Sequence, residues 1–137
     1  MEEVKLYVQR FWADVLEQNA DRLSCYFHDD AVIRWPCTNE QFTVSEYIKA
    51  NCLYPGKWDG EIERIMSGSD IWITVCRVWS KEHRASFHVV TMFRMRAGRI
   101  AEMDEVWGDD GPAPQWRQDL HIGQPIRNLP EAPRREK

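Results

Sequence analysis

Glu105 is the residue whose type and position point most directly to acid–base chemistry. It lies in the segment Arg99–Gly111, which has the pattern of a long strand that ends in a turn. Alternate residues of this strand share one face, and the mostly apolar face carries Glu105 together with Ala101, Met103 and Trp107. A carboxylate on a buried face is costly unless it is paired or has a chemical task. We therefore predict that Glu105 points into a cavity and acts there as a general acid or base.

Two further side chains could assist Glu105. On Ile71–Ser80 we expect the inward face to be the one that carries Arg77, together with Ile73, Val75 and Trp79. Arg77 could then pair with Glu105 or hold an anionic ligand, or its long side chain could extend to the rim. His88 falls on the outward face of Ala85–Arg96, whose inward face is Phe87, Val89, Thr91 and Phe93. His88 is either a general base or a histidine at a dimer interface.

Seven tryptophans in a small chain fit a large apolar cavity, a flat interface or a Trp-rich core. Asn51 lies late in the third predicted helix, and Trp58 follows the Pro55-Gly56 turn that closes it. These two residues either line a ligand or serve helix capping and lid packing. The predicted pocket walls are Trp35, Asn51, Trp58, Trp79, Thr91, Met103 and Trp107. The predicted ligand is a small apolar or aromatic molecule.

The segment Trp107–Gly111 contains two adjacent aspartates, Asp109 and Asp110. A hard-cation site needs more oxygen ligands than this segment supplies, so we expect the aspartates to bond nearby backbone N–H groups in a turn. The four cysteines form no CxxC pair and are expected to be buried thiols. No metal or organic cofactor is predicted. His121 lies further on, in a segment that could cover the pocket or cross to a partner subunit.

The elements that position these residues follow from hydrophobic periodicity. Apolar spacing predicts a helix over Glu2–Gln18, a short helix capped by Asn19 or Asp21, and a third helix that begins at the capping box Thr43–Glu46. Alternation predicts strands at Ala31–Trp35, Glu61–Ser67, Ile71–Ser80, Ala85–Arg96 and Ile100–Trp107. The fold class is therefore α+β, with three N-terminal helices packed on a strongly curved mixed or antiparallel sheet around a cone-shaped pocket. The uncovered sheet face predicts a homodimer.

Length and charge limit the possible functions. The chain has 137 residues, enough for one domain over 1–126, and 127–137 has the composition of a disordered tail. The net charge of −4 argues against nucleic-acid binding, and no apolar stretch is long enough to span a membrane. The N-terminus lacks the pattern of a signal peptide, so we expect a cytoplasmic protein.

Three features of the chain resemble the nuclear-transport-factor-2-like superfamily, and within it the SnoaL-like proteins. They are the two-helix start, the segment D-D-A-V-I-R-W-P at 29–36, and F-R-M-R-A-G-R-I-A-E-M-D-E-V-W at 93–107. The resemblance covers about residues 1–110, and W-G-D-D-G-P-A-P-Q-W-R at 107–117 is similar to a bacterial subgroup without an assigned activity. It implies a conical α+β domain, usually a homodimer across the sheet. The superfamily includes isomerases, dehydratases, cyclases and hydrolases, and also members with no chemistry.

The resemblance can be tested at the catalytic positions. The tyrosine, the general-base aspartate and the oxyanion-hole aspartate of ketosteroid isomerases fall on Phe11, Trp35 and Thr91, which argues against that mechanism. The acid/base aspartate of SnoaL-like polyketide cyclases falls on Glu105, or on Asp104 with a one-residue slip. The sequence thus predicts either a cofactor-independent lyase, isomerase or cyclase that uses Glu105, or a non-catalytic ligand-binding or dimerisation domain.

Overall fold

The computed structural model describes residues 1–127, so the predicted tail lies outside the described residues except for Arg127. The elements, in chain order, are helices α1 (Glu2–Glu17) and α2 (Ala20–Leu23), the 3₁₀ turn η1 (Ser24–Tyr26), strand β1 (Phe27–Trp35), the 3₁₀ turn η2 (Pro36–Thr38), strand β2 (Glu40–Thr43), helix α3 (Val44–Cys52), strands β3 (Trp58–Ser67), β4 (Ile71–Ser80), β5 (Ser86–Arg96) and β6 (Arg99–Asp109), and helix α4 (Gln115–Asp119). No helix of this described part is long and apolar enough to cross a membrane.

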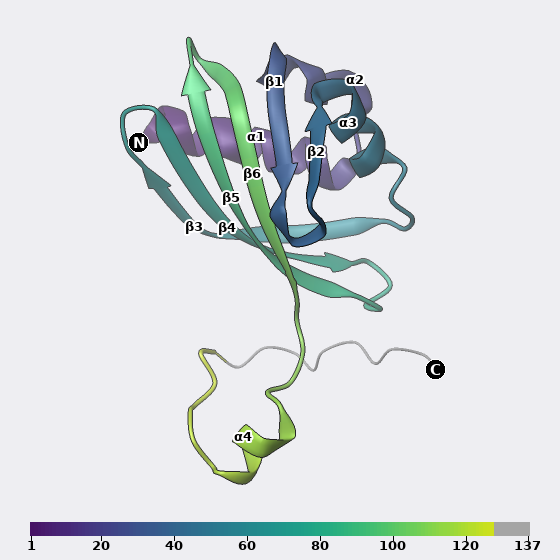
Figure 1. The fold of residues 1–137 in the computed structure, drawn as a ribbon, viewed down its shortest axis with the longest axis vertical. Helices are drawn as coiled ribbons and strands as arrows, with labels where there is room; N and C mark the ends of the chain where they lie inside the picture. Colours follow the sequence, from purple (N-terminus) through teal and green to yellow (C-terminus); the bar gives the residue numbers. More distant parts are fainter. Residues whose placement is uncertain (128–137) are drawn as a thin grey trace.

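The six strands form one open, strongly curved sheet in the order β2-β1-β6-β5-β4-β3. β1 and β6 are parallel and all other neighbours are antiparallel, so the sheet is mixed. Figure 1 shows α1 crossing one face of this sheet, while α2 and α3 lie together beside β1 and β2. The predicted α+β cone is confirmed.

An apolar stripe explains α1, and side-chain caps mark the starts of α2 and α3. α1 buries its apolar stripe, including Val8, Phe11 and Trp12, against the sheet. The Asn19 side chain accepts a hydrogen bond from the Arg22 amide at the start of α2, which confirms the predicted cap. The predicted capping box is present at the start of α3. It stabilises the helix that carries Asn51.

Strand register decides which side chains face the helices. Thr74 of β4, Thr91 of β5 and Glu105 of β6 are direct neighbours across three strands, and all three are buried. They form an inner polar row on the floor of the cone. Because alternation on β4 places Arg77 on the opposite face from Thr74, the expectation that Arg77 and Trp79 point inward is wrong. Both belong to the outer sheet face, where the Arg77 guanidinium lies over the Trp79 ring at 4.9 Å.

Several elements differ from the sequence-based expectation. β2 and α4 were not predicted, and β1 begins at Phe27, four residues before the expected start. Cys25 and Cys37 are exposed, so the prediction of four buried thiols is wrong for these two; all four cysteines are free. Beyond β6, residues 111–127 are all exposed, and α4 lies away from the helix–sheet body (Figure 1). At the end of this segment the Arg127 guanidinium forms ion pairs with the carboxylates of Glu61 and Glu63 on β3.

Candidate functional site

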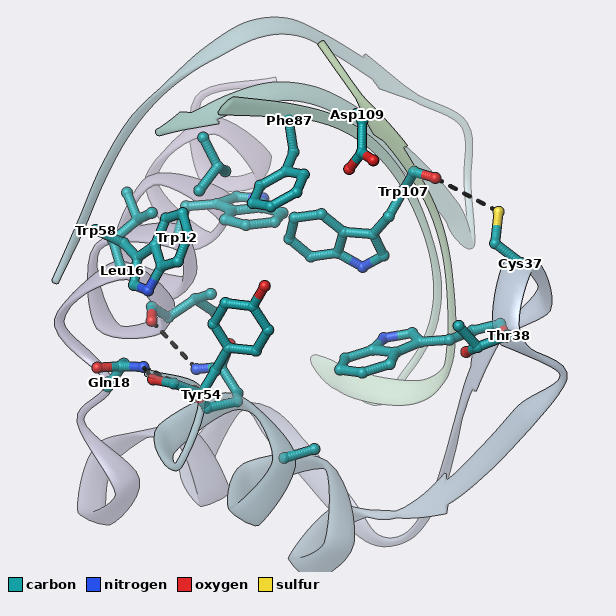
Figure 2. A pocket seen from close by; sticks show the side chains of 15 residues that line it. Trp12, Leu16, Gln18, Cys37, Thr38, Tyr54, Trp58, Phe87, Trp107 and Asp109 are labelled. Atoms are coloured by element: carbon teal, nitrogen blue, oxygen red, sulfur yellow. Dashed lines mark hydrogen bonds between the residues drawn. The ribbon is translucent and has the colours of Figure 1, made fainter. Parts of the chain in front are cut away.

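A cavity of about 290 Å³ opens between α1, the end of α3 and the sheet. Its wall is mainly apolar, and six of its fifteen residues are aromatic, namely Trp12, Trp35, Tyr54, Trp58, Phe87 and Trp107. Figure 2 shows the labelled rings of Trp12, Trp58, Phe87 and Trp107 around one hollow, with the Tyr54 hydroxyl pointing into it. Ligand sites in proteins are typically concave and lined mainly by hydrophobic and aromatic side chains, as this cavity is.

The rings support one another through edge and tilted contacts. The centroid of Phe87 lies 5.6 Å from that of Trp58 and 6.2 Å from that of Trp107. The centroids of Tyr54 and Trp58 are 5.4 Å apart, and the Trp58 indole N–H donates to the Pro55 carbonyl at 3.2 Å. These contacts fix the ring positions before any ligand enters, which reduces the entropy cost of binding.

Two amide side chains join the helix ends beside the cavity. The Gln18 amide donates to the backbone carbonyls of Asn51 and Tyr54, at 2.9 and 2.8 Å. The Asn51 amide donates to the Val15 carbonyl at 3.1 Å. Asn51 lies in the cavity wall, as expected, and it also ties α3 to the end of α1, which was the alternative reading of this residue.

Glu105 lies in the core with only 1% of its surface exposed. Its carboxyl oxygens accept hydrogen bonds from the Trp35 indole at 3.1 Å and from the Thr91 hydroxyl at 2.8 Å. Burial raises the pKa of Glu105 from 4.5 to about 7, because a charged carboxylate loses its hydration, while the two hydrogen bonds oppose the rise. The protonated and ionised forms therefore coexist near neutral pH.

The carboxyl group of Glu105 is adjacent to the cavity but separated from it. Trp35 lines the cavity and bonds Glu105, whereas Glu105, Thr91 and Met103 are not among the lining residues of the described chain. Thr91 and Met103, both predicted as pocket walls, are instead fully buried in the core below Trp35. Because Glu105 is 1% exposed and does not border the cavity, a ligand there would reach its carboxyl group only if neighbouring side chains moved.

Arg77 and His88, the predicted helpers of Glu105, lie on the outer sheet face. His88 contacts the carboxylates of Glu63, at 2.9 Å, and Asp110. Arg77 lies 4.0 Å from Asp110, which also accepts a hydrogen bond from the Ser86 hydroxyl. Asp110 thus bonds side chains, and the expectation that it bonds backbone N–H groups with its carboxylate is wrong. The sheet separates this cluster from Glu105.

The indole nitrogen of Trp107 is buried and has no hydrogen-bond partner within the described part of the chain. Trp107 lines the cavity, and the Trp35 ring lies beside it with centroids 6.5 Å apart. A buried donor without a partner is uncommon in a folded protein.

The structure brings together four of the predicted ligand residues, namely Trp35, Asn51, Trp58 and Trp107. The cavity wall also includes Trp12, Gln18, Tyr54 and Asp109, which were not predicted as wall residues. Trp12 was recognisable as part of the apolar stripe of α1, but periodicity cannot tell a core residue from one that borders a cavity. No group of three or more His, Cys, Asp or Glu side chains among residues 1–127 is arranged to hold a metal ion.

Known structures share the fold of this chain. An NTF-2 like protein of unknown function from Burkholderia xenovorans is 21% identical, with 90% of this chain and 95% of that chain covered and a TM-score of 0.73. A putative ketosteroid isomerase from Kribbella flavida is 16% identical, with 98% and 96% covered and a TM-score of 0.74. A protein with a ketosteroid isomerase-like fold from Catenulispora acidiphila, in complex with trimethylamine, is 14% identical, with 72% and 82% covered and a TM-score of 0.62. At these identities the likeness establishes the fold alone.

Sequence comparison assigns the family. Among curated proteins, none matches the chain significantly by sequence. The model of the SnoaL-like domain family matches residues 8–103, which span α1 to the middle of β6 and include most of the inner polar row and cavity wall. The chain therefore belongs to the SnoaL-like domain family, and it shares the fold of the NTF2-like proteins.

Proposed function

We propose that this protein binds a small, mainly apolar or aromatic molecule in the aromatic cavity. The observation that carries the proposal is the wall itself, in which six aromatic side chains surround a hollow of about 290 Å³. The hydrogen bonds at Gln18, Asn51 and Trp58 hold this wall in place without a ligand. The trimethylamine complex of the Catenulispora relative supports the view that this fold accommodates small organic molecules.

A cavity-filling variant tests this proposal. Ala50 lines the cavity, so Ala50→Phe should occupy its volume and abolish the binding of small aromatic fragments in ligand-observed NMR. Ala113→Phe, which adds the same ring at an exposed position, serves as the control and should leave binding unchanged. If fragments bind equally well to both variants, or if no fragment of the panel binds the unmodified protein, the proposal is wrong.

A second candidate function is acid–base catalysis by Glu105, as a cofactor-independent lyase, isomerase or cyclase. The specific observation in its favour is the pKa of about 7, which gives Glu105 a transferable proton near neutrality. Glu105 does not border the cavity, so the reaction would require movement of the side chains that cover its carboxyl group. Once a substrate is found, Glu105→Gln should abolish turnover and retain binding; unchanged turnover would remove this candidate.

We also propose that the protein is a homodimer through the outer sheet face. Val90 and Val106 are direct cross-strand neighbours there, and both remain 36% or more exposed, as does Met92. Adjacent exposed apolar side chains on an uncovered sheet face are typical of a protein–protein interface.

A further inference from the structure

Most side-chain donors in the cavity wall are already used within the protein. The indole N–H groups of Trp12, Trp35 and Trp58 donate to Thr74, Glu105 and the Pro55 carbonyl, respectively. The amides of Gln18 and Asn51, the Cys37 thiol and the Thr38 hydroxyl donate to backbone carbonyls. A ligand that accepts hydrogen bonds therefore has few wall groups with which to pair.

Two wall donors, the Tyr54 hydroxyl and the Trp107 indole, have no protein acceptor within residues 1–127. The Trp107 nitrogen is buried, so a ligand in the hollow does not touch it. Tyr54 is 52% exposed, and Figure 2 shows its hydroxyl inside the hollow. Of the side-chain donors in the described wall, the Tyr54 hydroxyl is therefore the one that a ligand can reach.

The position of the Tyr54 ring is fixed before a ligand enters. The Gln18 amide donates to the Tyr54 backbone carbonyl at 2.8 Å, and the Tyr54 ring lies against the Trp58 ring with centroids 5.4 Å apart. Trp58 is itself held by its hydrogen bond to the Pro55 carbonyl. Because backbone and ring are both held, the hydroxyl occupies a defined place in the hollow, which reduces the entropy cost of pairing with a ligand.

An acceptor that meets this hydroxyl should be uncharged. No lysine, arginine or histidine lies among the described residues that line the cavity, so a carboxylate or phosphate group would lose its hydration without gaining a cationic partner there. A ketone or ether oxygen loses less hydration, and one phenolic O–H group can replace it. A second acceptor on the enclosed part of the ligand would remain without a side-chain donor, which costs free energy.

We propose that the ligand presents one uncharged oxygen acceptor, such as a ketone or ether oxygen, on an otherwise apolar body, and that the Tyr54 hydroxyl donates to this oxygen. The inference rests on the proposed function, that the cavity binds a small molecule. It adds the polar group that this molecule carries and the residue that selects it.

A pair of probes that differ in one atom tests this inference. Acetophenone and α-methylstyrene have nearly the same shape, with a carbonyl oxygen in the first and a methylene carbon in the second. Their dissociation constants are measured by ligand-observed NMR with the unmodified protein and with two variants. Each probe is compared with itself across the variants, so the different solubilities of the two probes in water do not enter the comparison.

The two variants each remove one tyrosine hydroxyl. Tyr54→Phe keeps the ring and its contact with Trp58, and it should weaken binding of acetophenone about three- to tenfold with little change for α-methylstyrene. Tyr7→Phe removes a hydroxyl that donates to the Tyr26 carbonyl outside the cavity wall, and it should change neither affinity.

The outcomes separate this inference from the proposed function. An unchanged affinity of Tyr54→Phe for acetophenone, or an equal loss for both probes, would overturn the role of the Tyr54 hydroxyl and leave the small-molecule cavity intact. The inference is also wrong if acetophenone does not bind the unmodified protein while other fragments of the panel do. Failure of both probes together with the whole fragment panel would overturn the proposed function itself.

Discussion

At the scale of single residues, two opposing effects set the protonation of Glu105. Loss of hydration in the core favours the neutral form, and the hydrogen bonds from Thr91 and Trp35 favour the ionised form. Loss of hydration is the larger effect, so the pKa is raised from 4.5 to about 7. Because a group with a raised folded-state pKa binds its proton more tightly in the folded protein, Glu105 links folding stability to pH.

The sign of that linkage gives the first prediction. Below pH 4.5 Glu105 is protonated in both states, whereas between pH 4.5 and about 7 it is ionised only in the unfolded chain, so its contribution to stability falls as pH rises. Above pH 7 Glu105 is ionised in both states, and it lowers the free energy of unfolding by a constant amount, about 3 kcal/mol for a pKa shift of this size. Glu105→Gln should therefore make the protein about 3 kcal/mol more stable at pH 8 and have little effect at pH 4.5, in urea unfolding across this range.

The control for this prediction is a carboxylate at the surface. Glu82→Gln removes an exposed carboxylate whose partner is Arg84, and it should change the free energy of unfolding by less than about 1 kcal/mol at either pH. If Glu105→Gln is destabilising at pH 8, the carboxylate is held by stronger interactions than the two hydrogen bonds, and the raised pKa is wrong.

The inner polar row gives a matched pair of variants for the second prediction. Thr91→Val removes the hydroxyl that donates to Glu105, so the pKa of Glu105 should rise further, by about one unit. Thr74→Val removes a hydroxyl from the same row, but that hydroxyl bonds the Trp12 indole at 3.2 Å, so the pKa of Glu105 should not change. A ¹³C NMR titration of the Glu105 carboxyl carbon, assigned with the Glu105→Gln variant, measures both; equal shifts in the two variants would contradict the prediction.

At the scale of elements, helix α3 depends on its capping box. The Thr43 hydroxyl accepts from the Glu46 amide at 3.2 Å, and the Glu46 carboxylate accepts from the Thr43 amide at 2.9 Å. Thr43→Ala should lower the free energy of unfolding by about 1 kcal/mol, because the helix loses one of these bonds and leaves an amide without a partner. Ser45→Ala, at an exposed position of the same turn, is the control for thermal unfolding and should have a much smaller effect. A similar loss in both would show that the cap itself contributes little.

Local pattern was enough for β6 and not for β4. On β6 the apolar residues concentrate on one face, so alternation alone predicted that Glu105 is buried. On β4 both faces carry apolar residues, Ile73 and Val75 on one and Cys76 and Val78 on the other, so the sequence of the strand does not distinguish them. Which face of β4 points inward is decided by its pairing with the neighbouring strands. Thr74 lies opposite Thr91, and Thr91 lies opposite Glu105. The sequence of β4 alone does not encode this register.

The cavity was only partly predictable from the sequence, because some of its wall residues are positioned by contacts between distant parts of the chain. Tryptophan content and the Pro55-Gly56 turn indicated Trp58 and Trp107 as wall residues. Gln18 and Tyr54 join the wall because the Gln18 side chain bonds a backbone carbonyl 36 residues further along the chain, and residue type carries no signal for such a contact. Trp35 was predicted as a wall, but its hydrogen bond to Glu105 follows from the parallel pairing of β1 with β6.

At the scale of the whole molecule, the described residues 1–127 include exposed apolar side chains on the outer sheet face and in the segment that follows β6. The outer sheet face presents Val90, Met92 and Val106. Residues 111–127 carry exposed Trp116, Leu120 and Ile122. A two-fold arrangement of two copies would cover the same patch on both, which is the usual solution for a soluble protein with one uncovered sheet face.

The last prediction tests that arrangement. Sedimentation at tens of micromolar, a working range in which a specific dimer is populated, should give about twice the chain mass of 16.3 kDa.

The variant Val90→Lys places a charge among the exposed apolar side chains of the outer sheet face, opposite Val106. It should weaken the dimer at least about tenfold, because a charge buried in an interface without a counter-charge is costly. Leu53→Lys makes the same change at a residue that is 71% exposed at the end of α3, away from the sheet face, and should leave the dimer intact. A monomeric unmodified protein would exclude the dimer, and a dimer weakened by Leu53→Lys and not by Val90→Lys would move the interface from the sheet to the helices.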